Sequence, residues 1–120
     1  MSSHMQMESK ISEEMRRCID DCLNCASACT ETMMHCVQLG GEHAKPEHIR
    51  LLADCAEICE TSANFMLRSS NFHASTCGVC AEVCEACAVD CEKFPDDKMM
   101  MQCAEFCRTC ASSCREMAMH

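Results

Sequence analysis

The chain has 120 residues, room for one domain, and a formal net charge of −9 with no run of Lys or Arg. This charge excludes nucleic acid as a partner, because phosphates require a basic surface. No stretch approaches the roughly 18 apolar residues that span a bilayer, and no basic segment precedes an apolar export signal. The sequence therefore predicts a cytoplasmic protein without a membrane segment.

Sulfur dominates the composition. There are 16 Cys and 12 Met, no Trp or Tyr, and only 17 residues of Leu, Ile, Val and Phe together. That aliphatic and Phe content is below the roughly 20% at which a highly charged chain is typically disordered. A free thiol buries like a small hydrophobe, so cysteine must fill the core if the chain folds.

Sparse turn signals divide the chain into four segments of good helix formers. The signals are Gly40-Gly41 with Pro46, the polar run 69–71, and the Pro-Asp-Asp run 95–97. Gly is favoured just past a helix end, Pro at the first helical position, and Asp near a helix N-terminus. The expected helices are 12–39, 46–68, 72–93 and 96–118.

Short connections make consecutive helices antiparallel neighbours. The sequence therefore predicts an all-α fold, an antiparallel up-down-up-down four-helix bundle, as a single domain over residues 1–120. Residues 1–6 are interpreted as a tag remnant or a disordered end, because the opening Met-Ser-Ser-His-Met is typical of an expression scar.

The cysteines recur at steps of three, four or, once, seven residues within the expected helices, alternating between three and four where several follow one another. This spacing has a mean period of 3.5, which is typical of the a/d seam that a helix turns toward its partners. Four such seams predict a core made of sulfur. The cysteines are, helix by helix, Cys18, Cys22, Cys25, Cys29 and Cys36; Cys55 and Cys59; Cys77, Cys80, Cys84, Cys87 and Cys91; and Cys103, Cys107, Cys110 and Cys114.

Many of these cysteines form CxxxC pairs, whose side chains lie on one helix face within reach of each other. Two thiolates from neighbouring turns suit a soft metal that accepts low coordination, which is Cu(I). We therefore expect multiple Cu(I) ions per chain, with Cys36 and Cys77 bridging near the ends. The pairs are Cys18/Cys22, Cys25/Cys29, Cys55/Cys59, Cys80/Cys84, Cys87/Cys91, Cys103/Cys107 and Cys110/Cys114.

Other interpretations of the cysteines stay open. A purely structural thiol core is one, and a disulfide scaffold is another, although cytoplasmic disulfides are rare. Structural zinc needs four ligands presented by tight turns. The spacing from Cys77 to Cys87 also resembles iron–sulfur ligation, but no Pro follows the last cysteine. The alternative function is thus an iron–sulfur or zinc protein with an electron-transfer or structural role. No catalytic constellation indicates an enzyme.

Histidine and methionine extend the seams at both ends. His48 and Met100 lie beside Cys36 at one end, and His73 lies at the other, so these three are candidate accessory metal ligands. We expect copper to pass through the His48 end, because soft ligands can hand Cu(I) inward by exchange. The opposite end should be an apolar plug formed by Met15, Met66, Met117, Phe65 and Phe72.

Four segments carry a family resemblance: CIDDCLNC at 18–25, DCAEIC at 54–59, CAEVCEACAVDCEK at 80–93 and CAEFCRTCASSCREM at 103–117. They resemble the bacterial copper storage proteins, in particular the cytosolic branch, over about residues 15–118. The resemblance implies a four-helix bundle that assembles into a homotetramer and stores Cu(I), bound mostly by CxxxC pairs. Two positions depart from the family pattern: Thr32 replaces a frequent cysteine, and Phe94 replaces a frequent histidine.

Overall fold

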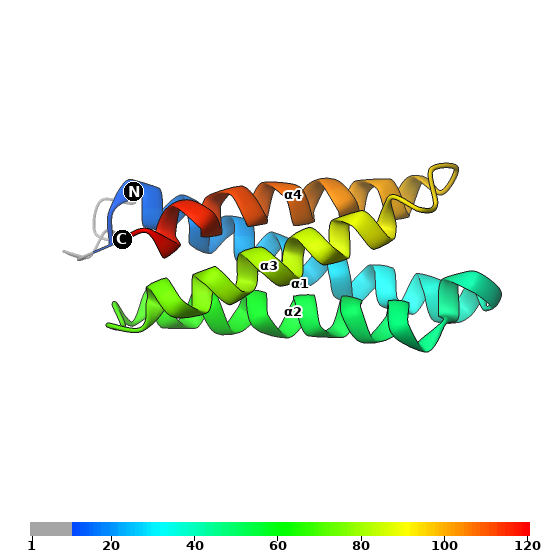
Figure 1. Cartoon of the computed structure of the whole chain (residues 1–120), viewed down its shortest axis with the longest axis horizontal. Coiled ribbons are helices and arrows are strands. Elements are labelled where there is room, and N and C mark those ends of the chain that lie inside the picture. The colour runs from blue at the N-terminus through cyan, green and yellow to red at the C-terminus, as the bar shows by residue number, and fades with distance from the viewer. Residues whose placement is uncertain (1–10) are drawn as a thin grey trace, which may run out of the picture.

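The computed structural model describes residues 11–120 and contains four long α-helices (Figure 1). The molecule measures 49 × 32 × 18 Å along its principal axes. The predicted all-α, up-down-up-down bundle is confirmed. Residues 1–6, interpreted as a tag remnant, lie outside the described residues. The elements are α1 (Glu13–Leu39), the short 3-10 helix η2 (Gly41–Ala44), α2 (Pro46–Leu67), α3 (His73–Cys91) and α4 (Lys98–Ala118).

The bundle has two different ends. The start of α1 and the C-terminus lie together with the α2–α3 connection at one end, which we call the termini end (Figure 1). The opposite end holds η2 and the α3–α4 connection, and we call it the η2 end (Figure 1). Among the helices of residues 11–120, none is long and apolar enough to cross a bilayer.

Side-chain caps fix the starts of α1 and α4. The Ser12 hydroxyl accepts a hydrogen bond from the Met15 amide at 3.1 Å. The Asp97 carboxylate accepts bonds from the Met99 and Met100 amides at 3.0 and 3.2 Å, so α4 begins one residue after Asp97. These bonds satisfy amide groups that have no partner within a helix.

The first helix ends and the second begins where the turn signals indicate. Gly40 has φ 71°, a conformation that glycine adopts without steric cost, and its amide bonds to the Cys36 carbonyl at 3.1 Å. Pro46 is the first residue of α2. Between them lies η2, a 3-10 turn that the sequence reading did not include.

α3 is shorter than the expected segment 72–93. The Lys93 amide bonds to the Asp90 carbonyl and the Phe94 amide bonds to the Cys91 carbonyl, at 3.2 and 3.1 Å. These three-residue turns tighten the chain after Cys91 and end the α-helix there.

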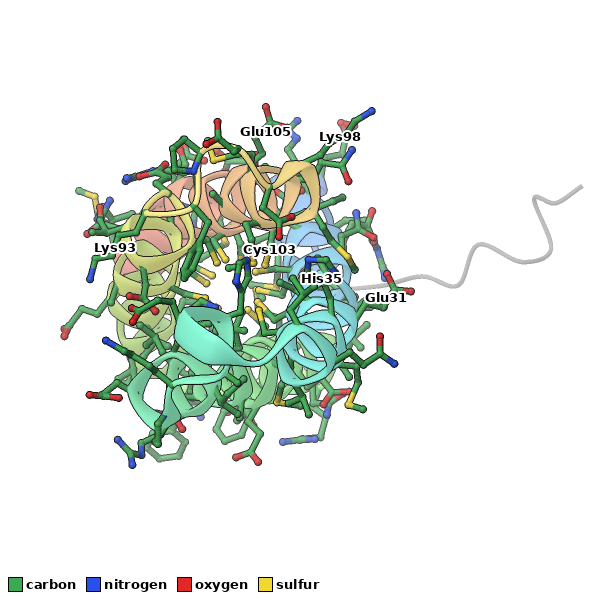
Figure 2. All side chains as sticks on the ribbon, turned by 90° about the vertical axis from the view of Figure 1, so that its right-hand side faces the viewer. Glu31, His35, Lys93, Lys98, Cys103 and Glu105 are labelled. Carbon is green, nitrogen blue, oxygen red and sulfur yellow. The ribbon has the colours of Figure 1, made fainter. Side chains whose placement is uncertain are left out.

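Sulfur fills the centre of the bundle. Viewed from the η2 end, the cysteine side chains point into the space enclosed by the four helices (Figure 2). Ile19 and Leu52 are the aliphatic side chains larger than alanine that are fully buried in residues 11–120. Small flanking residues let the helices approach closely; they are Ala26, Ala56, Ala63, Ala81, Ala88, Ala104 and Ala111.

Candidate metal centre

All sixteen cysteines carry free thiols, and each is at most 1% exposed. The prediction that the four cysteine seams face one another is therefore confirmed. Thr32 and Ser62, two seam positions without a thiol, are buried as well. The Ser62 hydroxyl donates to the Thr76 carbonyl at 3.1 Å, so its polarity is satisfied within the core.

The shortest contacts between cysteine sulfurs join different helices. Cys22 Sγ lies 3.5 Å from Cys114 Sγ, linking α1 to α4, and Cys59 Sγ lies 3.5 Å from Cys84 Sγ, linking α2 to α3. Sulfurs of pairs on one helix lie farther apart, at 4.0, 3.8 and 3.9 Å for Cys25/Cys29, Cys80/Cys84 and Cys110/Cys114. The CxxxC pattern thus marks the correct face, but the thiols also converge across the bundle.

Groups of four sulfurs overlap along the bundle axis. In each group all sulfur atoms lie within 4.8 Å of one another. Neighbouring groups share members, so a thiol of one group also belongs to the next. The groups are Cys22, Cys80, Cys110 and Cys114; Cys59, Cys80, Cys84 and Cys110; Cys25, Cys55, Cys59 and Cys84; and Cys25, Cys29, Cys55 and Cys107.

At these spacings the cysteine side chains need to move only slightly to bind metal ions. With metal–sulfur bonds of about 2.3 Å, three sulfurs around one ion lie roughly 4.0 Å apart. The contacts between cysteine sulfurs in the core span 3.5 to 4.0 Å. A small outward shift of the side chains is therefore enough to admit ions between the thiols.

Hydrogen bonds and burial favour the protonated thiol at several of the cysteines, as Cys110 and Cys36 show. Hydrogen bonds with Cys114 and Cys22, followed by burial, raise the pKa of Cys110. At the η2 end, burial and then the nearby Asp97 carboxylate raise the pKa of Cys36 to about 11. Since metals bind the thiolate, ions entering these sites must displace protons.

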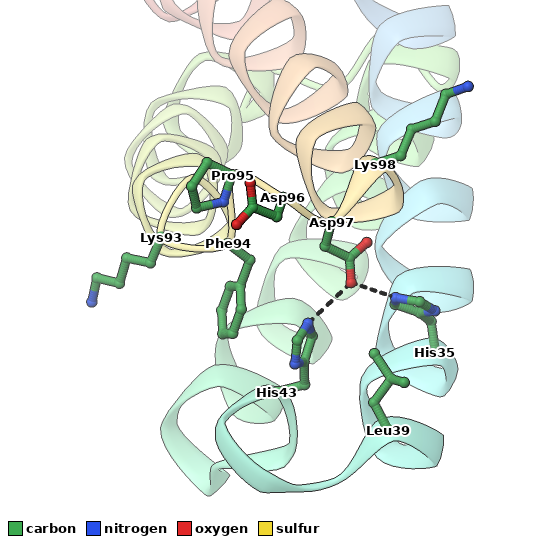
Figure 3. Close-up of a pocket in the computed structure, with 9 residues that line it drawn as sticks. All are labelled: His35, Leu39, His43, Lys93, Phe94, Pro95, Asp96, Asp97 and Lys98. Carbon is green, nitrogen blue, oxygen red and sulfur yellow. Dashed lines mark hydrogen bonds and ion pairs between the residues drawn. The ribbon is translucent and has the colours of Figure 1, made fainter.

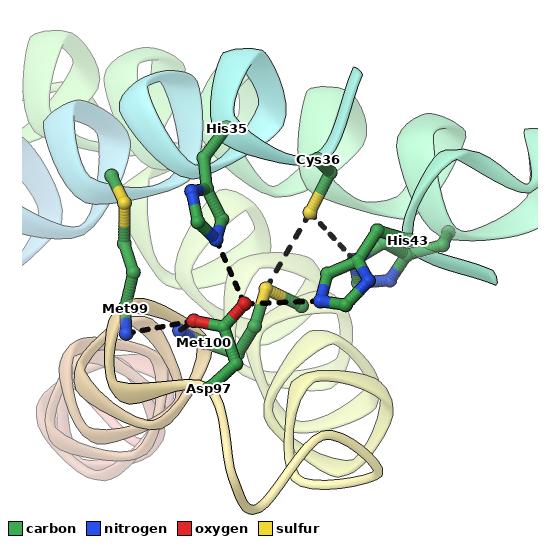
Figure 4. Close-up of polar contacts among 7 residues, drawn as sticks. His35, Cys36, His43, Asp97, Met99 and Met100 are labelled. Carbon is green, nitrogen blue, oxygen red and sulfur yellow. Dashed lines mark hydrogen bonds and ion pairs between the residues drawn. The ribbon is translucent and has the colours of Figure 1, made fainter. Parts of the chain in front are cut away.

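Two of the predicted accessory ligands, His48 and Met100, converge on Cys36 at the η2 end. Figure 4 shows Met100 beside Cys36. Its Sγ lies 3.3 Å from His48 Nε2 and 3.4 Å from Met100 Sδ. Both His48 and Met100 are buried. The structure thus brings a thiol, an imidazole nitrogen and a thioether together where the cysteine column ends.

Asp90 is a member of this cluster that sequence reasoning missed. Its carboxylate accepts a hydrogen bond from His48 Nδ1. Burial raises the pKa of Asp90, but His48 and Lys93 lower it more, so the net shift is downward. A proton held on Nδ1 leaves the Nε2 lone pair facing Cys36, the arrangement in which a carboxylate orients a metal-binding histidine. In the sequence, the only indication that Asp90 lies near the metal ligands is its position next to Cys91. That position does not reveal which helix the Asp90 side chain faces.

The termini end differs from the expected plug. Met66 and Met117 are buried there, and Met66 Sδ lies 3.8 Å from Cys77 Sγ. Phe72, however, is 68% exposed, so its assignment to the plug is wrong. The residue lies in the α2–α3 connection, immediately before α3, and its side chain faces away from the core.

His73 lies close to this end without joining a ligand cluster. Its Nδ1 bonds to the Ser70 carbonyl at 3.0 Å, and its Nε2 is buried with no hydrogen-bond partner among the described residues. Phe65, the other aromatic residue expected in the plug, lies beneath the Arg68 guanidinium, 5.1 Å from the ring centroid.

A four-helix bundle with a continuous thiol core defines a class of soft-metal-binding proteins. The sequence model of the copper storage protein family matches residues 11–119. The chain therefore belongs to the copper storage protein family. No curated protein sequence gives a significant match.

Solved structures of similar proteins share the fold. A Nitrosospira multiformis protein is 46% identical, with a TM-score of 0.84 over 89% of this chain and 96% of its own. A Cu(I)-bound copper storage protein from Bacillus subtilis is 36% identical, with a TM-score of 0.82 over 88% and 99%. A cytosolic copper storage protein from Streptomyces lividans is 32% identical, with a TM-score of 0.78 over 90% and 94%.

Proposed function

We propose that this protein stores Cu(I) in the cytosol, holding many ions between the sixteen core thiolates, and that it is not an enzyme. The observation that carries the proposal is the chain of overlapping sulfur groups along the bundle axis. Thiolates shared between neighbouring groups can bridge neighbouring ions, so the core suits a column of linked metal ions better than isolated sites.

This overlap also argues against the alternative function. A structural zinc site needs four ligands of its own. Cys25 and Cys55, however, each belong to two of the sulfur groups, as do Cys59, Cys80, Cys84 and Cys110. A Cu(I) ion accepts fewer thiolates and carries one charge, so a column of ions can neutralise thiolates that could not otherwise ionise side by side.

Relatives of known structure support copper as the cargo. The Bacillus subtilis protein is Cu(I)-bound, and a Streptomyces lividans protein, 29% identical with a TM-score of 0.81, is loaded with 10 copper equivalents. The Streptomyces lividans relative is described as cytosolic. These properties belong to the relatives, and their transfer to this chain is part of the proposal.

Copper is proposed to pass through the η2 end. The His48 nitrogen and the Met100 sulfur are borderline and soft ligands, and each lies within 3.4 Å of the Cys36 sulfur. At the termini end, His73 stays a candidate accessory ligand because its Nε2 has no hydrogen-bond partner among residues 11–120.

The deciding experiment is an anaerobic titration of the fully reduced protein with Cu(I), followed by gel filtration and elemental analysis. The seven CxxxC pairs set a minimum of seven ions per chain, and sharing of thiolates should raise the capacity well above it. The product should absorb only in the ultraviolet. Saturation at one or two ions per chain, or a brown product after incubation with iron and sulfide, would contradict copper storage.

We also propose that the chain forms a homotetramer, as its resemblance to the cytosolic proteins implies. Apolar side chains remain about half exposed on the helix surfaces, which is consistent with an interface between copies. Light scattering coupled to size exclusion should give four times the mass of one 13.4 kDa chain. A monomer mass at all concentrations tested would reject the tetramer. The exposed side chains are Leu23, Val79, Val89 and Phe106.

A further inference from the structure

A second group of potential metal ligands lies on the surface of the η2 end, outside the thiol core. His35 of α1, His43 of η2 and Asp97 before α4 converge in a surface pocket of about 660 Å³ (Figure 3). His35 Nε2 and His43 Nε2 lie 2.8 and 3.0 Å from the same oxygen, Asp97 Oδ2. Two separate elements thus aim one imidazole nitrogen each at an oxygen of a third.

The two oxygens of Asp97 have different partners. Oδ1 accepts the Met99 and Met100 amides that cap α4, while Oδ2 faces the two imidazoles. The carboxylate is therefore held by the helix it caps, and the oxygen that faces the pocket is oriented by that cap. A metal bound at Oδ2 need not disturb the capping bonds.

The two nitrogen–oxygen distances are compatible with neighbouring ligands of one metal ion. Adjacent ligands about 2.0 to 2.1 Å from a metal ion lie roughly 2.9 to 3.4 Å apart, depending on whether the geometry is octahedral or tetrahedral. The observed nitrogen–oxygen distances of 2.8 and 3.0 Å need only a slight expansion. Each imidazole would then carry its proton on Nδ1 and present the Nε2 lone pair to the ion.

The donor set differs in character from the thiol core. Two imidazoles and a carboxylate contain no sulfur and are typical of divalent first-row ions, with positions left for water. The side chains of His35, His43 and Asp97 are 27%, 22% and 17% exposed, so an ion can reach them from solvent. Cys36, next to His35 in sequence, instead points into the core and is fully buried (Figure 4).

We propose that His35, His43 and Asp97 bind one divalent first-row metal ion such as Zn²⁺ at the η2 end, separately from the copper in the core. Phe94 separates this site from the interior cluster, because its ring packs against both His43 and His48, at centroid distances of 4.2 and 5.3 Å. The bound ion would join α1, η2 and the start of α4.

The test uses the Cu(I)-loaded protein, so that copper occupies the thiols. Copper bound outside the core is first removed with a Cu(I)-selective chelator and gel filtration, and Zn²⁺ is then titrated calorimetrically. We expect one Zn²⁺ per chain. The double variant His35→Ala/His43→Ala should weaken binding at least about tenfold, and Asp97→Asn, which keeps the cap, should also weaken it.

Two controls test whether Zn²⁺ binds instead at another histidine or at the thiols. His120→Ala, which alters a histidine at the termini end, should bind Zn²⁺ as the wild type does. Co²⁺ used as a spectroscopic probe should give ligand-field bands without thiolate charge-transfer absorption. The proposal is overturned if the loaded wild type binds no Zn²⁺, if the double variant binds it equally well, or if Co²⁺ shows thiolate ligation.

Discussion

His48 has both ring nitrogens engaged inside the bundle. Nδ1 donates to the Asp90 carboxylate, and Nε2 faces the Cys36 sulfur at 3.3 Å. Met100 completes the group, with its thioether 3.4 Å from the same sulfur. A Cu(I) ion that exchanges from one soft ligand to the next can therefore move from the η2 end into the thiol column without losing all its protein ligands.

This arrangement predicts a kinetic role for His48 and Met100. Replacing both by Ala should slow Cu(I) uptake and release by at least about tenfold, because two of the three transfer ligands are lost. The final number of ions should stay nearly unchanged, because the core thiols remain. Stopped-flow ultraviolet absorption measures the rates, and elemental analysis measures the capacity.

The matched control acts at the termini end. The double variant His73→Ala/Met117→Ala removes the same residue types where we expect no copper to pass. It should load at the wild-type rate. If this variant loads slowly while His48→Ala/Met100→Ala loads normally, copper enters through the termini end and the assignment of the ends must be reversed.

Asp90 gives a separate prediction about positioning. Asp90→Asn should keep the size of the side chain but remove the charge that holds the proton on His48 Nδ1. Loss of such a supporting carboxylate typically lowers metal affinity by about 10- to 100-fold. Copper uptake at low Cu(I) concentration should therefore slow in this variant. Glu92→Gln, which removes only an exposed ion pair with Arg108, should load normally; equal effects of the two changes would exclude a positioning role.

At the scale of helices, the sequence predicted the ends that depend on local chemistry. Gly40 and Pro46 mark two boundaries correctly, because φ preference and ring geometry act within a few residues. α4 begins at Lys98, two residues later than expected, because Asp97 caps the helix from outside it. The turn η2 was not predicted, and α3 was expected to be longer than it is. Both differences arise just after a helix end, where backbone hydrogen bonds determine the course of the chain. The pattern of residue types alone does not specify those bonds.

For the cysteine seams too, the sequence predicts what depends on local spacing but not what depends on contacts between helices. A period of 3.5 residues identifies the buried face of a helix, and every predicted core cysteine is buried. The partner of each sulfur depends on how helices rotate and slide against one another. The contact between Cys22 and Cys114, which are 92 residues apart in the chain, could not be predicted from spacing within either helix.

Asp97 is expected to stabilise the start of α4. Asp97→Ala should lower the free energy of unfolding by about 1 kcal/mol through the lost cap. Asp97→Asn should cost less, since Asn is an equally good capping residue. Urea unfolding of the reduced, metal-free protein measures both changes. Equal losses in the two variants would show that the charge, rather than the cap, accounts for the stabilisation.

The charge of Asp97 also predicts a pH dependence. Burial raises the pKa of Asp97, but hydrogen bonds from His35, the Met100 amide and His43 lower it to about 2. Because this is below the unfolded value of about 3.9, the stabilisation is complete above that pH and is lost as the pH falls through 2. Between pH 4 and 2, the wild type should lose more stability than Asp97→Asn. A parallel decline would mean that Asp97 does not titrate in this way.

For the molecule as a whole, the metal-free state should already be folded. All four helices consist largely of good helix formers, α1 and α4 carry side-chain caps, and the thiols pack as small apolar groups. The reduced protein without copper should therefore give a largely helical circular dichroism spectrum. A random-coil spectrum that becomes helical only with Cu(I) would show that thiol packing cannot replace an aliphatic core.

Copper should nevertheless stabilise the bundle, because the closest thiols lie on different helices. α2 provides the sharpest test, since its only cysteines are Cys55 and Cys59, which contact Cys84 of α3 at 3.6 and 3.5 Å. Cys59 also lies 3.7 Å from Cys110 of α4. Ions bound at these two residues would tie α2 to its neighbours, whereas ions held within one CxxxC pair would tie α2 only to itself.

The comparison is between Cys55→Ala/Cys59→Ala and Cys87→Ala/Cys91→Ala, each lacking one CxxxC pair. α3 keeps Cys77, Cys80 and Cys84 in the second variant, but α2 keeps no thiol in the first. The rise in Tm on loading with Cu(I), measured against each variant's own metal-free form, should be smaller by several degrees in the α2 variant, since about 1 kcal/mol shifts Tm by a few degrees at this size. Each variant lacks one CxxxC pair. Equal rises in Tm would therefore indicate that copper binds mainly within the CxxxC pairs of single helices.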